Sequence, residues 1–193
     1  GAGDVYVADT VDDRVMVLPV GGATAVPVGF TGLHGPQSVA VDGSGGVYVA
    51  DTLNNRVVVL PSGGAQATLG FTGLDAPAGG AVDASGRVYV ADTNNDRVVV
   101  LPAGGGAQTT LDVSGLSAPA GVAVDASGNV YVADTGNDRI VLSPADGGAQ
   151  VVLGISGLDA PAGVAVDGSG NVYVADTNDD EVVRLTRTAP ELR

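Results

Sequence analysis

The 193-residue chain contains no cysteine, no lysine and no tryptophan, and the absence of cysteine excludes a class of site. Without cysteine there is no disulfide and no thiolate metal ligand. The eight basic residues are all arginines and stand against 22 acidic residues, so the formal net charge is −14. That charge repels phosphate backbones and anionic lipid headgroups, and we expect no nucleic-acid partner and no partner at a membrane surface.

Long apolar runs and catalytic motifs are also missing. No run of 18 apolar residues occurs, so the sequence predicts no membrane insertion. The one histidine, His34, cannot supply a multi-histidine metal site, and we expect it to be exposed. The chain has neither a Gly-x-Ser-x-Gly elbow nor a phosphate-binding loop. No catalytic residue is therefore assigned.

What the sequence does contain is a repeat. The pentapeptide Tyr-Val-Ala-Asp-Thr occurs five times, at spacings of 42, 41, 42 and 42 residues. Self-similarity at such a period indicates a repeat architecture. The tyrosines that open the five copies, and that we expect to pack between repeats, are Tyr6, Tyr48, Tyr89, Tyr131 and Tyr173.

Each complete copy holds four strand candidates separated by turn residues. In the fourth copy they cover 121–125, 130–135, 139–142 and 150–153, and all are rich in valine or other apolar residues. The run Val47-Tyr48-Val49-Ala50 is apolar on both faces of a strand, which indicates burial on both faces, as in a propeller blade. The outer strands of the first two copies are expected at 23–28 and 66–69.

The sequence thus predicts an all-β fold, a β-propeller of four-stranded antiparallel blades, in one domain over 1–187 with a tail at 188–193. The first copy lacks its first strand and the fifth lacks its fourth, which gives eighteen strands in five blades. We expect the open edges of the terminal blades to meet each other or to pair with a second copy of the chain. The alternatives are part of a six-bladed ring and an oligomeric ring. The repeats cover about 1–35, 36–76, 77–118, 119–160 and 161–187.

The longer motif P-x-G-V-A-V-D-x-S-G-N-V-Y-V-A-D-T-x-N-x-R-V resembles the NHL-repeat family of β-propellers. It matches at 161–177 and 119–140, nearly at 77–98 and 36–57, and in part at 4–15. The finer pattern is similar to the extracellular sensor propellers of mycobacterial receptor serine/threonine kinases and to idealised propellers designed from them. That resemblance implies an extracellular location. The family as a whole includes sensors, protein-interaction modules and some enzymes.

Aspartate and arginine recur across the turn after each pentapeptide. A carboxylate paired with a guanidinium there is expected to brace each blade. Copy one keeps the pair as Asp9 and Arg14, whereas copy five sets Asp176 against Glu181, so the last blade is expected to be braced less well. The three regular pairs are Asp51 with Arg56, Asp92 with Arg97, and Asp134 with Arg139.

The acidic loops are the feature that most suggests a ligand. Converging carboxylates could hold a hard cation such as Ca²⁺ or meet a basic partner, and the alternative is a solvated rim that keeps the chain soluble. No other cofactor is expected. The candidates are Asp12, Asp13, Asp96, Asp138, Asp179 and Asp180, with Asp75 and Asp159 from the loops between copies.

The near-identity of the copies favours a non-catalytic scaffold or a recognition and sensor module for a protein or small-molecule ligand. A catalytic site needs chemically distinct residues in one place, and these copies offer the same residues in each. The rival hypothesis is a propeller enzyme of the lyase or lactonase type with a cation at the mouth of the channel. A homo-oligomer formed through the incomplete terminal blades is a further alternative.

Overall fold

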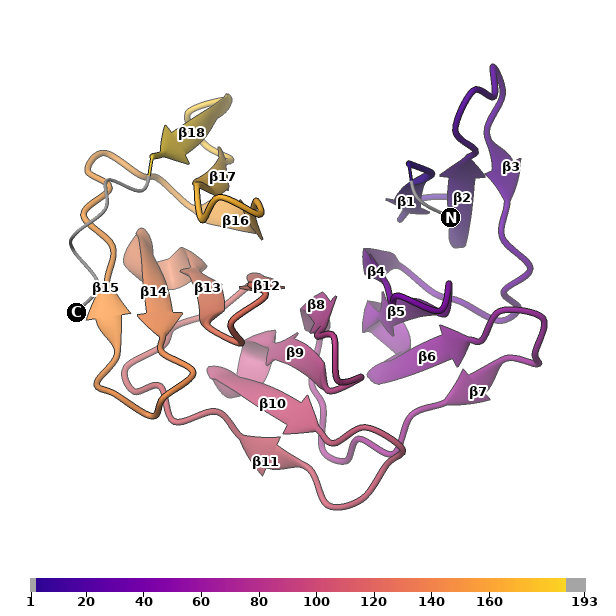
Figure 1. Ribbon diagram of the computed structural model, residues 1–193, viewed down its shortest axis with the longest axis horizontal. Coiled ribbons are helices and arrows are strands. Elements are labelled where there is room, and N and C mark those ends of the chain that lie inside the picture. Colours follow the sequence, from indigo (N-terminus) through magenta and orange to yellow (C-terminus); the bar gives the residue numbers. More distant parts are fainter. Residues whose placement is uncertain (1–2, 187–193) are drawn as a thin grey trace.

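The computed structural model describes residues 3–186, whose strands form five antiparallel sheets in chain order (Figure 1). The second, third and fourth sheets have four strands and the first and fifth have three, so the fold is an all-β propeller of five blades with incomplete terminal blades. No helix among these residues is long and apolar enough to cross a membrane. The elements of blades 1 to 5, in order, are β1 (Val5–Asp9), β2 (Arg14–Leu18) and β3 (Val26–Pro27); β4 (Pro36–Val41), β5 (Val47–Asp51), η1 (Thr52–Asn54), β6 (Arg56–Leu60) and β7 (Ala67–Thr68); β8 (Pro77–Val82), β9 (Val88–Asp92), η2 (Thr93–Asn95), β10 (Arg97–Leu101) and β11 (Thr109–Thr110); β12 (Gly121–Val124), β13 (Val130–Asp134), η3 (Thr135–Asn137), β14 (Arg139–Ser143) and β15 (Val151–Val152); and β16 (Pro161–Val166), β17 (Val172–Asp176) and β18 (Glu181–Leu185).

The strands of each complete blade run from an inner strand to an outer strand, as in β8-β9-β10-β11 of blade 3. The outer strands are shorter than the sequence predicts, because β3 and β7 each pair over two residues only. Both residues of each are exposed, so little apolar burial supports a longer ladder. The glutamine before β7 binds outside the sheet, since Gln66 Oε1 accepts the Thr31 amide at 2.8 Å and Nε2 donates to the Thr31 carbonyl at 3.0 Å.

Side chains of the middle strands alternate between the two neighbouring blades. In blade 2, Val47 and Val49 pack on Val15 of blade 1, whereas Tyr48 packs against Val90 of blade 3. This alternation explains why the strands are apolar on both faces, since each face meets a different blade. The core is accordingly divided into four clusters, one at each junction between blades.

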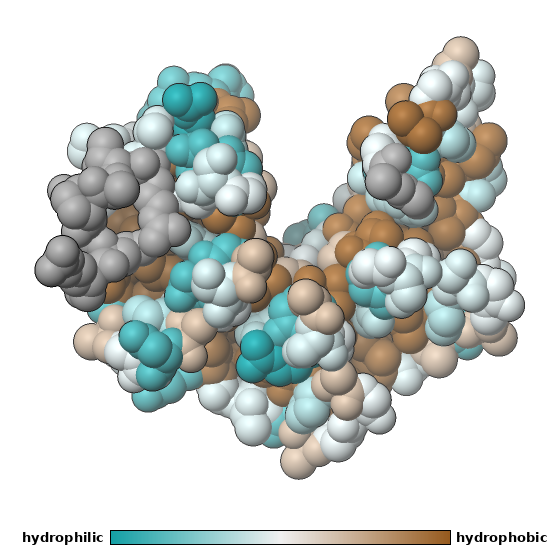
Figure 2. All heavy atoms as spheres, in the orientation of Figure 1, coloured by the Kyte–Doolittle hydropathy of each residue, from teal (hydrophilic) through white to brown (hydrophobic). Residues whose placement is uncertain are grey.

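Blades 1 and 5 do not meet, and the array is an open arc (Figures 1 and 2). Val5 and Val7, whose counterparts in the other blades face a preceding blade, are 55 % and 52 % exposed, and Val182 of blade 5 is 70 % exposed. The expectation that the two open edges meet each other is therefore wrong. The four junctions repeat the same kind of contact, so each adds a similar rotation, and four such rotations leave the ends apart.

Four of the repeat tyrosines pack at the junctions between blades, but Tyr173 does not, because no blade follows blade 5. The expectation that all five pack between repeats is therefore wrong for Tyr173. The tyrosines of blades 2 to 5 also reach back to the first turn of their own blade. Tyr89 and Tyr131 are 3 % exposed, whereas Tyr6, Tyr48 and Tyr173 are half-buried. The Tyr89 hydroxyl lies 3.2 Å from Oδ2 of an aspartate in the Asp-x-Ser-Gly turn, and the corresponding distances in blades 2, 4 and 5 are 2.9, 3.3 and 3.2 Å. The tyrosines of blades 2, 3 and 4 thus link a junction between blades to a hairpin.

Candidate functional site

The aspartate of the pentapeptide is fully buried in each four-stranded blade. In blade 4, Asp134 Oδ2 accepts hydrogen bonds from Arg139 Nε at 2.6 Å and from Asn137 Nδ2 at 2.9 Å. Its Oδ1 accepts the Ser117 amide, in the loop between blades, at 2.7 Å. One carboxylate therefore holds the turn, the next strand and the entering loop together. The matching ion pairs join Asp51 to Arg56 at 2.6 Å and Asp92 to Arg97 at 2.7 Å, while Asp9 and Arg14 pair at 2.8 Å on the more exposed blade 1.

Three of the acidic residues predicted as cation ligands instead tie each blade to the next. They end the turn between the second and third strands with positive φ, a conformation that aspartate and asparagine tolerate. In this position the side-chain oxygen accepts a hydrogen bond from a backbone amide that leads into the following blade. These bonds run from Gly35 N to Asp13 at 2.6 Å, from Ala118 N to Asp96 at 2.7 Å and from Ala160 N to Asp138 at 2.8 Å, and Asn55 accepts from Ala76 N at 2.8 Å.

The other acidic candidates form no cluster of three or more within residues 3–186. Asp12 pairs with Arg14 at 2.7 Å, and Asp179 and Asp180 are exposed. Within residues 3–186 no group of three or more acidic, histidine or cysteine side chains is placed to hold a metal ion. His34 is exposed, and its backbone forms hydrogen bonds: the amide donates to Asp51 at 2.6 Å and the carbonyl accepts the Leu53 amide at 3.1 Å. The loop residues Asp75 and Asp159 accept from Asn94 and Asn178 at 3.1 and 2.9 Å.

The threonine of the pentapeptide has a role that the sequence analysis missed. Its hydroxyl donates to the proline carbonyl that opens the next blade, 2.8 Å away at all four junctions. The signal was present, since the threonine recurs in all five copies. The bonds run from Thr10 to Pro36, Thr52 to Pro77, Thr93 to Pro119 and Thr135 to Pro161.

Blade 5 departs from this arrangement. Asp176 is 1 % exposed, and its Oδ1 accepts the Asp159 amide at 2.8 Å. Its Oδ2 is buried without a hydrogen-bond partner among the described residues, because Glu181 and Asp179 replace the arginine and the asparagine that serve the other blades. A buried carboxylate oxygen without a hydrogen-bond partner lowers stability. We therefore expect blade 5 to be less stable than the four-stranded blades.

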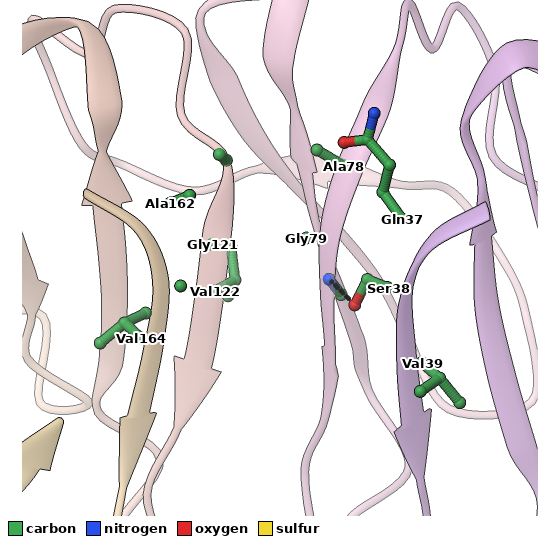
Figure 3. A pocket seen from close by; sticks show the side chains of 12 residues that line it. Gln37, Ser38, Val39, Ala78, Gly79, Gly121, Val122, Ala162 and Val164 are labelled. Atoms are coloured by element: carbon green, nitrogen blue, oxygen red, sulfur yellow. Dashed lines mark hydrogen bonds between the residues drawn. The ribbon is translucent and has the colours of Figure 1, made fainter. Parts of the chain in front are cut away.

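The inner strands enclose an axial pocket of about 340 Å³ (Figure 3). None of its twelve lining residues is ionisable, and Gln37 and Ser38 carry its only polar side chains. Glycine is required there, because a Cβ at Gly79 would lie 2.3 Å from the Ala120 carbonyl oxygen of the next blade. The Ser38 hydroxyl accepts the Gly80 amide at 3.0 Å, so part of this polarity joins β4 to β8.

These sheets and junctions define the molecule as a β-propeller built from one repeated unit. The family model for the NHL repeat matches residues 33–60, 74–101, 116–141 and 158–184, which is more than half of the chain. The protein belongs to the NHL repeat family. The incomplete first copy lies outside the matched residues, and the finer resemblance to kinase sensors or designed propellers stays a prediction.

Solved structures show the same fold. A chain in the crystal structure of a nidogen/laminin complex is 25 % identical with a TM-score of 0.84, over 95 % of this chain and 71 % of that one. Virginiamycin B lyase from Staphylococcus aureus is 13 % identical with a TM-score of 0.74, over 99 % and 69 % of the two chains. A streptogramin B lyase structure is 17 % identical with a TM-score of 0.75, over 100 % and 68 %. A comparison with curated protein sequences gave no match.

Placing an arginine at the position of Glu181 in blade 5, as in the other blades, should stabilise the protein. We expect Glu181→Arg to raise the free energy of unfolding by about 1–3 kcal/mol, since it removes a like charge and gives Asp176 Oδ2 a charged donor. Urea denaturation measures the change. The matched control is Arg139→Glu, which copies the blade 5 arrangement into blade 4 and should be destabilising. Equal stability of all three proteins would show that the pair does not brace the blade.

Proposed function

We propose that this chain is a non-catalytic propeller that serves as a scaffold or recognition module. The observation that carries the proposal is the use of the acidic residues. The buried aspartates and the residues Asp13, Asp96 and Asp138 hold strands and blades together, and the axial pocket has no ionisable lining residue. An acid, a base or a cation ligand at the channel would need groups that are free of such structural bonds.

The likeness to a chain of the nidogen/laminin complex supports a binding role. That structure contains a protein complex, and at 25 % identity and a TM-score of 0.84 it is more similar to this chain than the lyases are. Propellers present their loop surfaces at the two rims of the array, where a ligand can span several blades. The partner class we propose is a protein or small-molecule ligand.

The rival is a propeller lyase or lactonase with a cation at the channel mouth. The lyase structures are 13–17 % identical to this chain and therefore support the fold alone. A cation site in this chain would have to use acidic loop residues such as Asp12 and Asp179, which have no buried role.

A cation and turnover test separates the two hypotheses. A ligand raises the melting temperature only when it binds the folded state. Since we propose that the acidic residues have structural roles and bind no cation, we expect millimolar Ca²⁺ to leave the melting temperature unchanged. We also expect no turnover of a panel of lactones and cyclic peptides, with or without Ca²⁺. Turnover that the double variant Asp12→Asn, Asp179→Asn abolishes would contradict the proposal and favour the rival.

We further propose that the terminal blades bind a second copy of the chain. Blade 1 exposes the valine face that blades 2 to 5 bury, and blade 5 exposes the opposite face that blades 1 to 4 bury. For example, Val182 is 70 % exposed, whereas its counterpart Ile140 is 0 % exposed. Each chain thus carries both halves of one junction, which favours head-to-tail association.

Sedimentation velocity at increasing protein concentration tests this association. We expect species larger than the monomer, and we expect Val7→Arg or Val182→Arg to return the protein to the monomer. The matched control is Val152→Arg, because Val152 is 50 % exposed on the outer strand of blade 4, away from both terminal faces. A monomer at every concentration would contradict the second-copy proposal.

A further inference from the structure

One position of the Asp-x-Ser-Gly-x turn differs in chemistry between the blades. The residue after the glycine is an arginine in blade 3 and an asparagine in blades 4 and 5, but a glycine, Gly46, in blade 2. In blades 3, 4 and 5 the side chain of this residue binds the aspartate that opens the turn. The bonds run from Arg87 Nε to Asp83 Oδ2 at 2.6 Å, from Asn129 Nδ2 to Asp125 Oδ2 at 2.8 Å and from Asn171 Nδ2 to Asp167 Oδ2 at 2.8 Å.

In blade 2 the corresponding oxygen lacks that side-chain cap. Asp42 Oδ2 accepts one hydrogen bond, from the Tyr48 hydroxyl at 2.9 Å, while Oδ1 accepts the Ser44 and Gly46 amides at 2.8 Å. A Cβ at Gly46 would lie 2.7 Å from Oδ2, so glycine lets the carboxylate turn toward the backbone there. The carboxylate oxygen thus has room for a further donor.

A cavity lies beside Gly46. The space between blades 2 and 3 has a volume of about 520 Å³ and is lined by Asp42, Gly46 and Tyr48 with apolar walls from Val59 and Leu69. The corresponding space between blades 3 and 4, where Arg87 is present and Asp112 stands in place of Gly70, has a volume of about 250 Å³. Cavities of a few hundred Å³ with apolar walls and a few polar groups are typical of small-molecule sites.

The charge of the Asp42 carboxylate favours a positively charged ligand in this cavity. Burial by itself raises the pKa of Asp42, but hydrogen bonds from the Gly46 amide, the Ser44 side chain and the Tyr48 hydroxyl outweigh it and lower the pKa below its ordinary value. The carboxylate is therefore ionised at neutral pH, within a chain of net charge −14. An anion is disfavoured here, and a donor with positive charge is favoured.

We propose that the cavity between blades 2 and 3 binds a guanidinium group carried on a short apolar stem. The chain itself provides the template. In blade 3, the guanidinium of Arg87 binds Asp83 and lies over the ring of Tyr89, with Cζ 5.7 Å from the ring centroid. Blade 2 has the same two potential partners, Asp42 and Tyr48, but a glycine at the position of the arginine.

A planar cation fits these partners better than a spherical one. A guanidinium directs several N–H donors in one plane, so it can bind a carboxylate with its edge while its face contacts an aromatic ring. The stem would lie along Val59 and Leu69, as the aliphatic part of an arginine covers apolar surface. This ligand chemistry deepens the recognition function proposed above and rests on it.

Titration with ethylguanidine, followed by the backbone amide resonances of the ¹⁵N-labelled protein, tests the proposal. We expect saturable shifts centred on Ser44, Gly46 and Gly86, with one site per chain. Asp42→Asn should weaken binding about tenfold or more, as the loss of a charge-assisted hydrogen bond predicts. Gly46→Arg should abolish binding by filling the cavity from within, and Gly46→Asn repeats this test if the arginine variant does not fold.

The matched control is Arg87→Gly with Asp112→Gly, which gives the space beside Asp83 the same two glycines that the first cavity has and should raise the stoichiometry to two. One site or none in that double variant would overturn the proposal, and so would binding that survives Gly46→Arg. Equal affinity for ethylammonium would show attraction to a carboxylate without guanidinium recognition, which also overturns it. These results are independent of the turnover assay, so failure here leaves the non-catalytic function to be judged on that assay.

Discussion

A buried carboxylate needs hydrogen bonds to both of its oxygens, and in this propeller that requirement organises each complete blade. Asp134 satisfies it with a turn asparagine, an arginine on the next strand and the amide of a loop residue 17 positions before Asp134 in the chain. Leaving any of these groups unpaired in the core would be costly. The same carboxylate thereby fixes the hairpin and the path by which the chain enters the blade.

The polar bonds between blades complement the apolar junctions. Each junction buries valine and tyrosine side chains, and at its edge a threonine hydroxyl and an asparagine or aspartate oxygen bind backbone groups of the next blade. Since these roles recur at all four junctions, they do not distinguish one junction from another. Specific function is therefore to be sought where the copies differ, as at Gly46, at Glu181 and on the exposed faces of blades 1 and 5.

The sequence predicted the fold because the signals are local. The 42-residue period, the apolar runs such as 47–50 and the turn residues give five blades and eighteen strands, and both are observed. The role of Asp96 was not predictable, since its partner is a backbone amide 22 residues away in another blade and no side-chain pattern marks it. The open arc was also missed, because closure depends on the rotation at each junction, which no single residue encodes. Gly46 stood out only once the contact made by its counterpart Arg87 was known.

The most direct test of the central role of the buried aspartate compares Asp134→Asn with Asp9→Asn by denaturant unfolding. The two residues occupy the same repeat position, but the Asp134 side chain is 0 % exposed with three described donors, whereas the Asp9 side chain is 31 % exposed and pairs with Arg14. We predict that Asp134→Asn lowers the free energy of unfolding by about 3–5 kcal/mol, as the loss of one partner of a buried ion pair does. Asp9→Asn should cost only a small fraction of that. Equal losses in the two variants would contradict the account.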